Sequence, residues 1–209
     1  MNDRSSRAWQ RMLSGRRLDL LDPSAVDIEL ADIALGLSRV ARWNGQTTGE
    51  HAFSVAQHSL LVTDLVTEDP LAGNPRFLLA ALLHDASEYV TSDLITPFKA
   101  AVGPEYKKVE ARLTQAVHVR FGLPGVLPVS WKRAIKRADK TAAYLEAILL
   151  AGFSERDGRR ILGYRGDAPA VTLEPWPPEV AKAAFLDRFA AIGQEIDAAD
   201  RKPRTARRA

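Results

Sequence analysis

The chain has 209 residues, 46% of them hydrophobic, and it contains no cysteine. This length and composition suit one domain with a sizeable core, and the absence of thiols excludes disulfides, zinc–thiolate sites and cysteine nucleophiles. The net charge is +3, but five of the 29 Lys and Arg residues lie in the last nine positions, so the rest of the chain is slightly acidic. We therefore expect one domain over residues 1–200 and a basic, disordered tail over residues 201–209.

The two ends of the chain bear on location and partners. The basic tail has no interleaved aromatic residues to stack on bases, so we expect it to aid solubility, and nucleic acid is expected as a partner only through this tail. The N-terminal segment leads into no apolar stretch of signal-peptide type, and no window reaches the roughly 18 apolar residues of a membrane span. These features favour a soluble, cytoplasmic protein without a membrane partner.

Periodic apolar segments predict helices along the first half of the chain. Asp22-Pro23 resembles an N-cap followed by a first helical proline, and Gly36 lies near the expected end of that helix. A second helix is expected from about Ser54 to Glu68. Asn74-Pro75 opens a third helix, which we expect to carry His84 and Asp85.

The second half continues the same pattern. A helix is expected from Pro104 to Phe121, and Ser130 is expected to cap the helix that carries Asp139. Residues 152–178 are rich in Gly, Pro and Arg and predict a long loop, with room for a short hairpin near 161–164.

A last helix is expected to start at Glu179. Because no convincing alternating stretch appears elsewhere, the fold class predicted is all-α, a single helical bundle with a Gly/Pro-rich loop near 152–178.

Polar residues in three apolar segments predict a metal site. His84-Asp85 follows the apolar run 77–83, His58 lies in a second apolar segment, and Asp139 lies in a third. A buried, unpaired carboxylate costs several kcal/mol or else takes up a proton, so a cation should meet Asp139. Imidazole and carboxylate together suit one divalent ion such as Mn, Fe, Co, Zn or Mg. The alternatives are ordinary core histidines and an ion pair of Asp139 with Lys136 or Lys140.

Two further carboxylates are candidates for catalysis. On the helix expected to carry His84 and Asp85, Glu88 is i+4 from His84 and i+3 from Asp85, so its carboxylate is expected to emerge beside both. Asp93 follows in the next turn. A divalent ion lowers the pKa of bound water and polarises a phosphoryl oxygen, so hydrolysis of phosphate esters is the reaction class indicated. The alternative for Glu88 is an ordinary surface glutamate.

The series His58, His84-Asp85, Asp139 resembles the metal-binding signature of the HD-domain phosphohydrolases. The segment HDASEYVTSDLITPFK, from His84 to Lys99, resembles the bacterial 5'-deoxynucleotidase branch of that family. Further similar segments are EYKKVE (105–110), ADKTAAYLEA (138–147) and Arg42-Trp43. The resemblance covers roughly residues 39–150 and implies a metal-dependent phosphohydrolase that removes the 5'-phosphate from 2'-deoxyribonucleoside monophosphates.

The resemblance also implies a role for each matching residue. It implies that His58, His84, Asp85 and Asp139 bind one divalent metal ion. It also implies that Glu88 activates the attacking water and that Asp93 transfers a proton or positions the leaving group. Arg42 would bind the phosphate, Trp43 would give a preference for deoxyribose, and Lys99 would make a lesser phosphate contact. Ordinary core packing is the alternative for Trp43. A nucleotide substrate and a homodimer are the partners that the resemblance implies.

Some positions depart from the pattern of this branch. The interval between His58 and His84 is shorter than expected, and His51 offers an alternative ligand, although it lies in a Gly-rich turn. Ser92 stands where a glycine is expected, and Ile95 replaces a proline, so the turn that carries Asp93 is expected to differ. A shortened entry resembles HD enzymes that remove triphosphate from a deoxynucleoside triphosphate such as dATP. The remaining alternative is a nucleotide-sensing or nucleic-acid-binding module without turnover.

Overall fold

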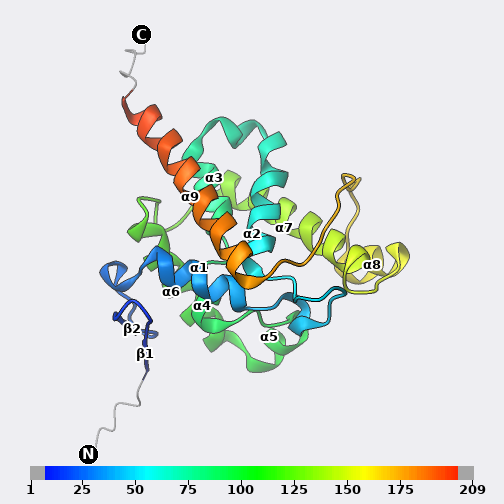
Figure 1. Ribbon diagram of the computed structural model, residues 1–209, viewed down its shortest axis with the longest axis horizontal. Helices are drawn as coiled ribbons and strands as arrows, with labels where there is room; N and C mark the ends of the chain where they lie inside the picture. The colour runs from blue at the N-terminus through cyan, green and yellow to red at the C-terminus, as the bar shows by residue number, and fades with distance from the viewer. Residues whose placement is uncertain (1–7, 202–209) are drawn as a thin grey trace, which may run out of the picture.

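In the computed structural model, which describes residues 8–201, α-helices form the body of the protein (Figure 1). The α-helices are α1 Leu30–Arg39, α2 Val55–Leu65, α3 Pro75–Leu82, α4 Glu88–Thr91, α5 Thr96–Val102, α6 Pro104–Arg120, α7 Val129–Leu149, α8 Glu155–Leu162 and α9 Pro178–Arg201. Short 3-10 helices are η1 Ala25–Asp27, η2 Arg42–Gly45, η3 Val66–Glu68 and η4 Pro70–Gly73. The all-α prediction is confirmed, apart from one small hairpin.

That hairpin pairs β1 Trp9–Arg11 with β2 Arg17–Asp19 in antiparallel register. Gly15 in the connecting turn has φ +98°, which only glycine adopts readily. Leu18 is fully buried and anchors the hairpin to the helical core. Strands of three residues are too short to show an alternating pattern, so the sequence did not predict them.

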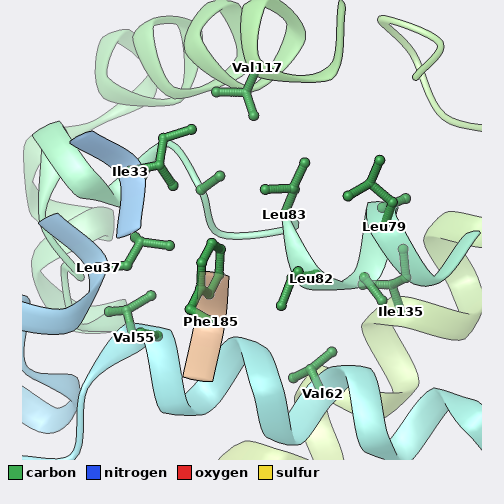
Figure 2. Packing of buried hydrophobic residues seen from close by; sticks show 14 of the residues in the cluster. Ile33, Leu37, Val55, Val62, Leu79, Leu82, Leu83, Val117, Ile135 and Phe185 are labelled. Carbon is green, nitrogen blue, oxygen red and sulfur yellow. The ribbon is translucent and has the colours of Figure 1, made fainter. Parts of the chain in front are cut away.

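The core lies where α9 crosses α1, α2 and α3 (Figure 1). Phe185 from α9 is fully buried and lies among Leu37 of α1, Val55 of α2 and Leu82 of α3 (Figure 2). Full burial of each such side chain contributes about 1.5–3 kcal/mol. On the opposite side α2 packs against α7, and this α2–α7 pair carries two of the candidate metal ligands.

Several predicted helix ends are confirmed. Ser54 caps α2 by accepting a hydrogen bond from the backbone N–H of Gln57, and η3 then extends the helical path to Glu68. Asn74 caps α3, the predicted 104–121 helix is α6, and the last helix starts at Pro178.

The predicted start of the first helix is wrong. Only η1 follows Asp22-Pro23, and α1 begins at Leu30. Between them the backbone is extended at Ile28, whose side chain is fully buried and whose carbonyl accepts a 2.8 Å hydrogen bond from Arg120 Nε. This tertiary contact holds the chain out of the helical conformation.

The third helix also differs from the prediction. It ends at Leu82, so His84 and Asp85 lie in a turn between α3 and α4. His84 Nδ1 lies 2.8 Å from the carbonyl oxygen of Ala81, where a continuing helix would offer a backbone N–H. Glu88 therefore starts a new helix instead of lying one turn beyond His84.

Residues 152–178 are not one continuous loop. Ser154 caps helix α8, whose C-cap Gly163 is in the left-handed conformation, and within this range only 152–154 and 163–177 lack helix or strand. The suggested hairpin near 161–164 is wrong because α8 occupies its first half. Gln57 Nε2 donates to the carbonyl of Glu174, and Gln57 Oε1 accepts from the backbone N–H of Trp176, so α2 holds the end of this segment.

Smaller differences concern α7 and α5. The N-cap of α7 is Pro128 without a side-chain cap bond, so Ser130 lies inside the first turn and is not the cap. Helix α5 was not predicted; Pro97 lies in its first turn, where a missing N–H is tolerated.

A close approach of helices fixes the start of α4. A Cβ added at Gly36 on α1 would lie 2.7 Å from Tyr89 Cβ and 2.8 Å from the Tyr89 carbonyl oxygen. Only glycine lets α1 and α4 come this close. Glu88 precedes Tyr89 and is positioned by the same contact.

Two remaining expectations concern membrane-spanning helices and the ends of the chain. Among residues 8–201, none of the helices combines the length and the apolar character needed to cross a bilayer. Residues 1–7 and 202–209, which include most of the predicted basic tail, lie outside the described residues. The division into a 1–200 domain and a tail stays a prediction.

Candidate metal centre and substrate site

Three segments bring candidate metal ligands together. His58 comes from α2, His84 from the α3–α4 turn and Asp139 from α7. One ligand atom from each lies within 4.8 Å of the others, so these residues could hold a metal ion. His51 is not in this group.

Hydrogen bonds set the tautomers of both histidines. His58 Nδ1 lies 2.6 Å from Glu146 Oε1, and His84 Nδ1 lies 2.8 Å from the Ala81 carbonyl oxygen. A carboxylate and a carbonyl only accept, so each Nδ1 carries the proton. The Nε2 lone pairs of the two rings are left to face each other at 3.2 Å. Two facing lone pairs repel unless a proton on one Nε2, which the raised pKa of His58 favours, or a metal ion lies between them.

Asp85 completes a set of four donors. It is outside the three-residue group, but its Oδ2 lies 3.2 Å from His84 Nε2 and 3.4 Å from His58 Nε2. Asp139 Oδ1 lies 3.5 Å from His58 Nε2. Ligand atoms about 2.0–2.2 Å from one ion lie roughly 3–3.5 Å from each other. The spacing of these donors therefore fits a single first-row divalent ion.

The two oxygens of Asp139 have different neighbours. Oδ1 faces His58, while Oδ2 accepts a 2.9 Å ion pair from Lys136 on the same helix. Burial acts to raise the pKa of Asp139, but the hydrogen bond and charge of His58 outweigh it and the pKa lies well below its usual range. The sequence alternatives, an ion pair with Lys136 and a place in the metal centre, are therefore compatible.

Carboxylates dominate the electrostatics around His58. Burial and the charge of Arg42 act to lower the pKa of His58. The surrounding carboxylates, Glu146 first among them, outweigh both, and the pKa lies well above its usual range. The donor set thus attracts a positive charge, which is the property a metal site requires.

Glu88 is buried beside the donor set, with only 2% of its surface exposed. Burial raises its pKa to about 9, and the nearby charges of Asp85 and Asp93 add to the effect. Oε1 lies 3.4 Å from Lys99 Nζ, whereas Oε2 is buried and has no hydrogen-bond partner in the part of the chain that the structure describes. One oxygen of Glu88 is therefore available to a water molecule or substrate.

The turn between α1 and α2 carries Arg42 and Trp43. The Arg42 backbone N–H donates to the Phe53 carbonyl at 2.8 Å, so the turn returns to the start of α2. Arg42 Nη1 donates to Asp93 Oδ2 at 2.8 Å. The Trp43 ring lies 5.6 Å from the ring of Phe153. The turn thereby lies next to the metal centre.

Glu146 is a residue of this site that sequence reasoning missed. It is fully buried on α7 and accepts hydrogen bonds from Arg42 Nε, Trp43 Nε1 and His58 Nδ1. The available signal was its spacing: Glu146 is seven residues, or two helical turns, beyond Asp139 and therefore on the same face of α7.

Two predicted residues lie at the edge of the site. Lys99 Nζ lies 3.4 Å from Glu88 Oε1 and 3.5 Å from Glu110 Oε1, so the Lys99 ammonium forms ion pairs with both carboxylates. Asp93 is paired with Arg42. Ser92, before Asp93, has φ 63° and ψ 160°, so the chain keeps a glycine-type backbone there despite the serine.

A large groove lies elsewhere on the surface. It measures about 1600 Å³ and runs between the α2–α7 pair and the segment 163–176. Gln57 and Ala138, the neighbours of two candidate ligands, line it, but none of the four donors does. The groove is therefore separate from the metal centre.

Comparison with known proteins bears directly on these residues. Residues 33–152 match the family described as 5'-deoxynucleotidase YfbR-like. The chain belongs to this family. The matched range contains all four donors, Glu88, Asp93 and Glu146, and nearly coincides with the 39–150 range of the resemblance seen in the sequence. As a member of the YfbR-like family, the protein is an HD-type nucleotide phosphohydrolase.

Some individual proteins are similar to a longer part of this chain. An uncharacterized protein of Rhodobacter capsulatus is 60% identical over 87% of this chain and 94% of its own length. An uncharacterized protein of Escherichia coli, YfdR, is 35% identical over 78% of this chain and 83% of its own. A 5'-deoxynucleotidase of Pectobacterium atrosepticum is 32% identical over 57% and 72%, respectively.

A solved structure is also similar to this chain. It is a cyanophage S-2L HD phosphohydrolase (DatZ) bound to dA and one catalytic Zn²⁺ ion, with 18% identity over 79% of this chain and 95% of that chain, and a TM-score of 0.49. This similarity is too distant to guide the assignment of residues.

Proposed function

We propose that this protein is a metal-dependent 5'-deoxynucleotidase that hydrolyses the phosphate monoester of 2'-deoxyribonucleoside monophosphates. The observation that carries the proposal is the convergence of the two Nε2 atoms at 3.2 Å with the carboxylates of Asp85 and Asp139, beside the Arg42 guanidinium. The family membership and the Pectobacterium relative named as a 5'-deoxynucleotidase support the choice of substrate.

His58, His84, Asp85 and Asp139 would hold one divalent ion of the Mn, Co, Zn, Fe or Mg type. When bound, such an ion acidifies a water molecule and polarises a phosphoryl oxygen. The charge of the bound ion would lower the pKa of Glu88, which is about 9 without it, so that Glu88 would be ionised and its buried Oε2 would accept a proton from the attacking water. The protein supplies the acceptor without rearrangement, because α4 is fixed against α1.

Arg42 binds the phosphate in this proposal. Its Nε and Nη1 donate to Glu146 and Asp93, and within the described part of the chain its Nη2 has no partner. A planar guanidinium held on two sides presents its remaining N–H groups in a fixed direction. Asp93 holds Arg42 through Oδ2, and in this proposal its other oxygen would assist the leaving group. Lys99 acts through Glu88 and contacts phosphate only weakly.

Trp43 recognises the sugar. Its indole N–H is held by Glu146, so the ring face, backed by Phe153, is left to pack against the deoxyribose. A ring at this position disfavours a 2'-hydroxyl, because the hydroxyl would lose its water without gaining a hydrogen bond.

A row of cations favours a second candidate, a deoxynucleoside triphosphate triphosphohydrolase. These cations lie on the exposed face of α7 and are Lys132, Arg133, Lys136, Arg137 and Lys140. Lys136 contacts the metal-ligand candidate Asp139. Further phosphates of a triphosphate substrate would find positive charge there.

The test uses metal-free protein reloaded separately with Mn²⁺, Co²⁺, Zn²⁺ or Mg²⁺. Products from dAMP, AMP and dATP are separated, with Glu88→Ala as the control for contaminating phosphatases. We expect orthophosphate from dAMP, little from AMP, and none with Glu88→Ala. Inorganic triphosphate from dATP with dAMP untouched would favour the second candidate, and no product with any metal would contradict both.

A further inference from the structure

Glu146 is a carboxylate that the sequence comparison with this enzyme branch left without a role. Its side chain has no solvent exposure, and its three partners come from α2 and the α1–α2 turn. A buried carboxylate is tolerated only when charge and hydrogen bonds satisfy it. Each partner is itself a proposed functional residue.

Each of these three partners contacts one of the two carboxylate oxygens of Glu146. Oε1 accepts from His58 Nδ1 at 2.6 Å, while Oε2 accepts from Arg42 Nε at 3.1 Å and Trp43 Nε1 at 2.9 Å. The first bond fixes the tautomer and the ring orientation of a metal ligand. The other two fix the direction of the phosphate-binding guanidinium and of the ring that meets the sugar.

The backbone of the α1–α2 turn gives independent support. Trp43 has φ 57° and ψ 28°, and Asn44 has φ 51° and ψ 32°. A left-handed conformation is unfavourable for a side chain with a Cβ, and such strain persists where the surroundings hold it. The bonds from Arg42 and Trp43 to Glu146 hold this turn, together with the contacts of Arg42 with Asp93 and of Trp43 with Phe153.

We infer that Glu146 is a positioning residue that couples the metal centre to substrate recognition through one buried carboxylate. The inference rests on the proposed function, because it explains how that site is organised. Partners of metal-ligating histidines typically contribute 10- to 100-fold to metal affinity. Glu146 therefore contributes to metal binding and to the deoxyribose preference at the same time.

A purely structural role makes a different prediction. If Glu146 only neutralised the buried Arg42, its loss would lower stability but leave metal binding unchanged, because Asp93 would still pair with Arg42. Metal affinity measured without substrate separates the two roles.

The experiment titrates the full-length, metal-free protein with Co²⁺, whose visible absorption reports the ligand geometry. We expect Glu146→Gln to bind Co²⁺ roughly 10- to 100-fold more weakly, with an altered spectrum. It should also raise the KM for dAMP and reduce the ratio of dAMP to AMP turnover. Trp43→Phe, which removes only the indole donor, should change KM and this ratio and leave Co²⁺ affinity at the wild-type value.

The matched control is Glu105→Gln, at an exposed glutamate that pairs with Lys108, and it should change neither readout. Circular dichroism checks folding; if Glu146→Gln does not fold, Glu146→Asp keeps the charge but withdraws the carboxylate by one methylene. We expect this variant to fall between wild type and the loss predicted for Gln. Wild-type Co²⁺ affinity in the folded variant would overturn the inference.

Two other outcomes separate the coupling by Glu146 from the proposed function. Weaker Co²⁺ binding with unchanged KM and selectivity would overturn the coupling. Failure of the wild-type protein to bind Co²⁺ would overturn the proposed function and the inference together, whereas Co²⁺ binding by an enzyme inactive on dAMP would contradict only the substrate assignment.

Discussion

The environment of Glu88 supports its proposed role in proton transfer. It is buried, one oxygen contacts Lys99, and the other has no hydrogen-bond partner among residues 8–201. A surface glutamate, the alternative considered from the sequence, would be solvated at both oxygens. The structure places Glu88 inside, because α4 starts there and packs against α1.

Replacing Glu88 by Gln should lower kcat by about 10²- to 10⁴-fold, since the amide cannot accept the proton from the attacking water. The change keeps size and leaves the donor set intact. Steady-state kinetics with dAMP measures the loss, and a Co²⁺ titration should show unchanged metal binding. A variant with more than half of the wild-type kcat would exclude Glu88 as the proton acceptor.

Ser92 carries backbone strain at another position of the site. Its φ of 63° and ψ of 160° lie in a region that essentially only glycine occupies, and such a conformation costs about 1–3 kcal/mol for other residues. Ser92→Gly should therefore raise the free energy of unfolding, by about 1 kcal/mol once the greater freedom of glycine in the unfolded chain is subtracted.

Urea denaturation of Ser92→Gly measures this gain. Ser92→Ala is the matched control, because alanine keeps the Cβ and hence the strain. Equal midpoints for Ser92→Gly and wild type, with an unchanged denaturant slope, would show that the strain is absent in solution.

At the scale of elements, the contact between α1 and α4 positions Glu88, the proposed proton acceptor. A Cβ at Gly36 would meet the Tyr89 backbone at 2.8 Å, and backbone cannot rotate away as a side chain can. Gly36→Ala should lower the free energy of unfolding by about 1–3 kcal/mol despite the better helix propensity of alanine.

The same substitution should lower kcat for dAMP, because Glu88 precedes Tyr89 and moves with it. Gly193→Ala on α9 is the control, since a Cβ there meets nothing within 4 Å. Increased stability of Gly36→Ala would contradict the close approach of the two helices.

Sequence patterns identified most elements but not where tertiary contacts end them. Caps such as Ser54 and Asn74 act within four residues, so they can be recognised locally. The end of α3 depends on the bond from His84 to Ala81 and on the fit of α4 against α1, neither of which periodicity reveals. Helix α8 was missed because its strongly polar composition and flanking glycines suggested a loop.

In the candidate site, too, the sequence pattern did not reveal contacts between residues far apart in the chain. The four metal-ligand candidates could be chosen because each is polar within an apolar segment or matches a known motif. Glu146 is also polar within an apolar segment, but its partners lie 88 to 104 residues away in the sequence. Its function depends on those partners, so the sequence pattern alone did not distinguish it from an ordinary glutamate.

At the scale of the whole molecule, one bound ion should stabilise the fold. Binding to the folded state at 100 times Kd adds about 2.7 kcal/mol, which corresponds to a rise in Tm of roughly 5–11 °C for a chain of this size. The donors come from separate segments that are apart in the unfolded chain, so the unfolded chain binds the ion weakly.

Differential scanning fluorimetry with Mn²⁺ or Co²⁺ measures the rise, and a chelator should reverse it. His84→Ala should lose the shift, whereas Arg133→Ala, an exposed change on α7, should keep it. An equal rise in Tm for His84→Ala would mean that the ion stabilises the protein by binding at another site.

The hydrogen bonds of Glu146 also bear on how the protein folds. They connect α7 to residues encoded about a hundred positions earlier, and closing such long loops is a slow, late step in folding. During synthesis, α2 and the Arg42–Trp43 turn leave the ribosome well before α7. The emerging chain therefore lacks Asp139 and Glu146 until α7 docks, so the complete set of metal-ligand candidates forms only in the folded protein.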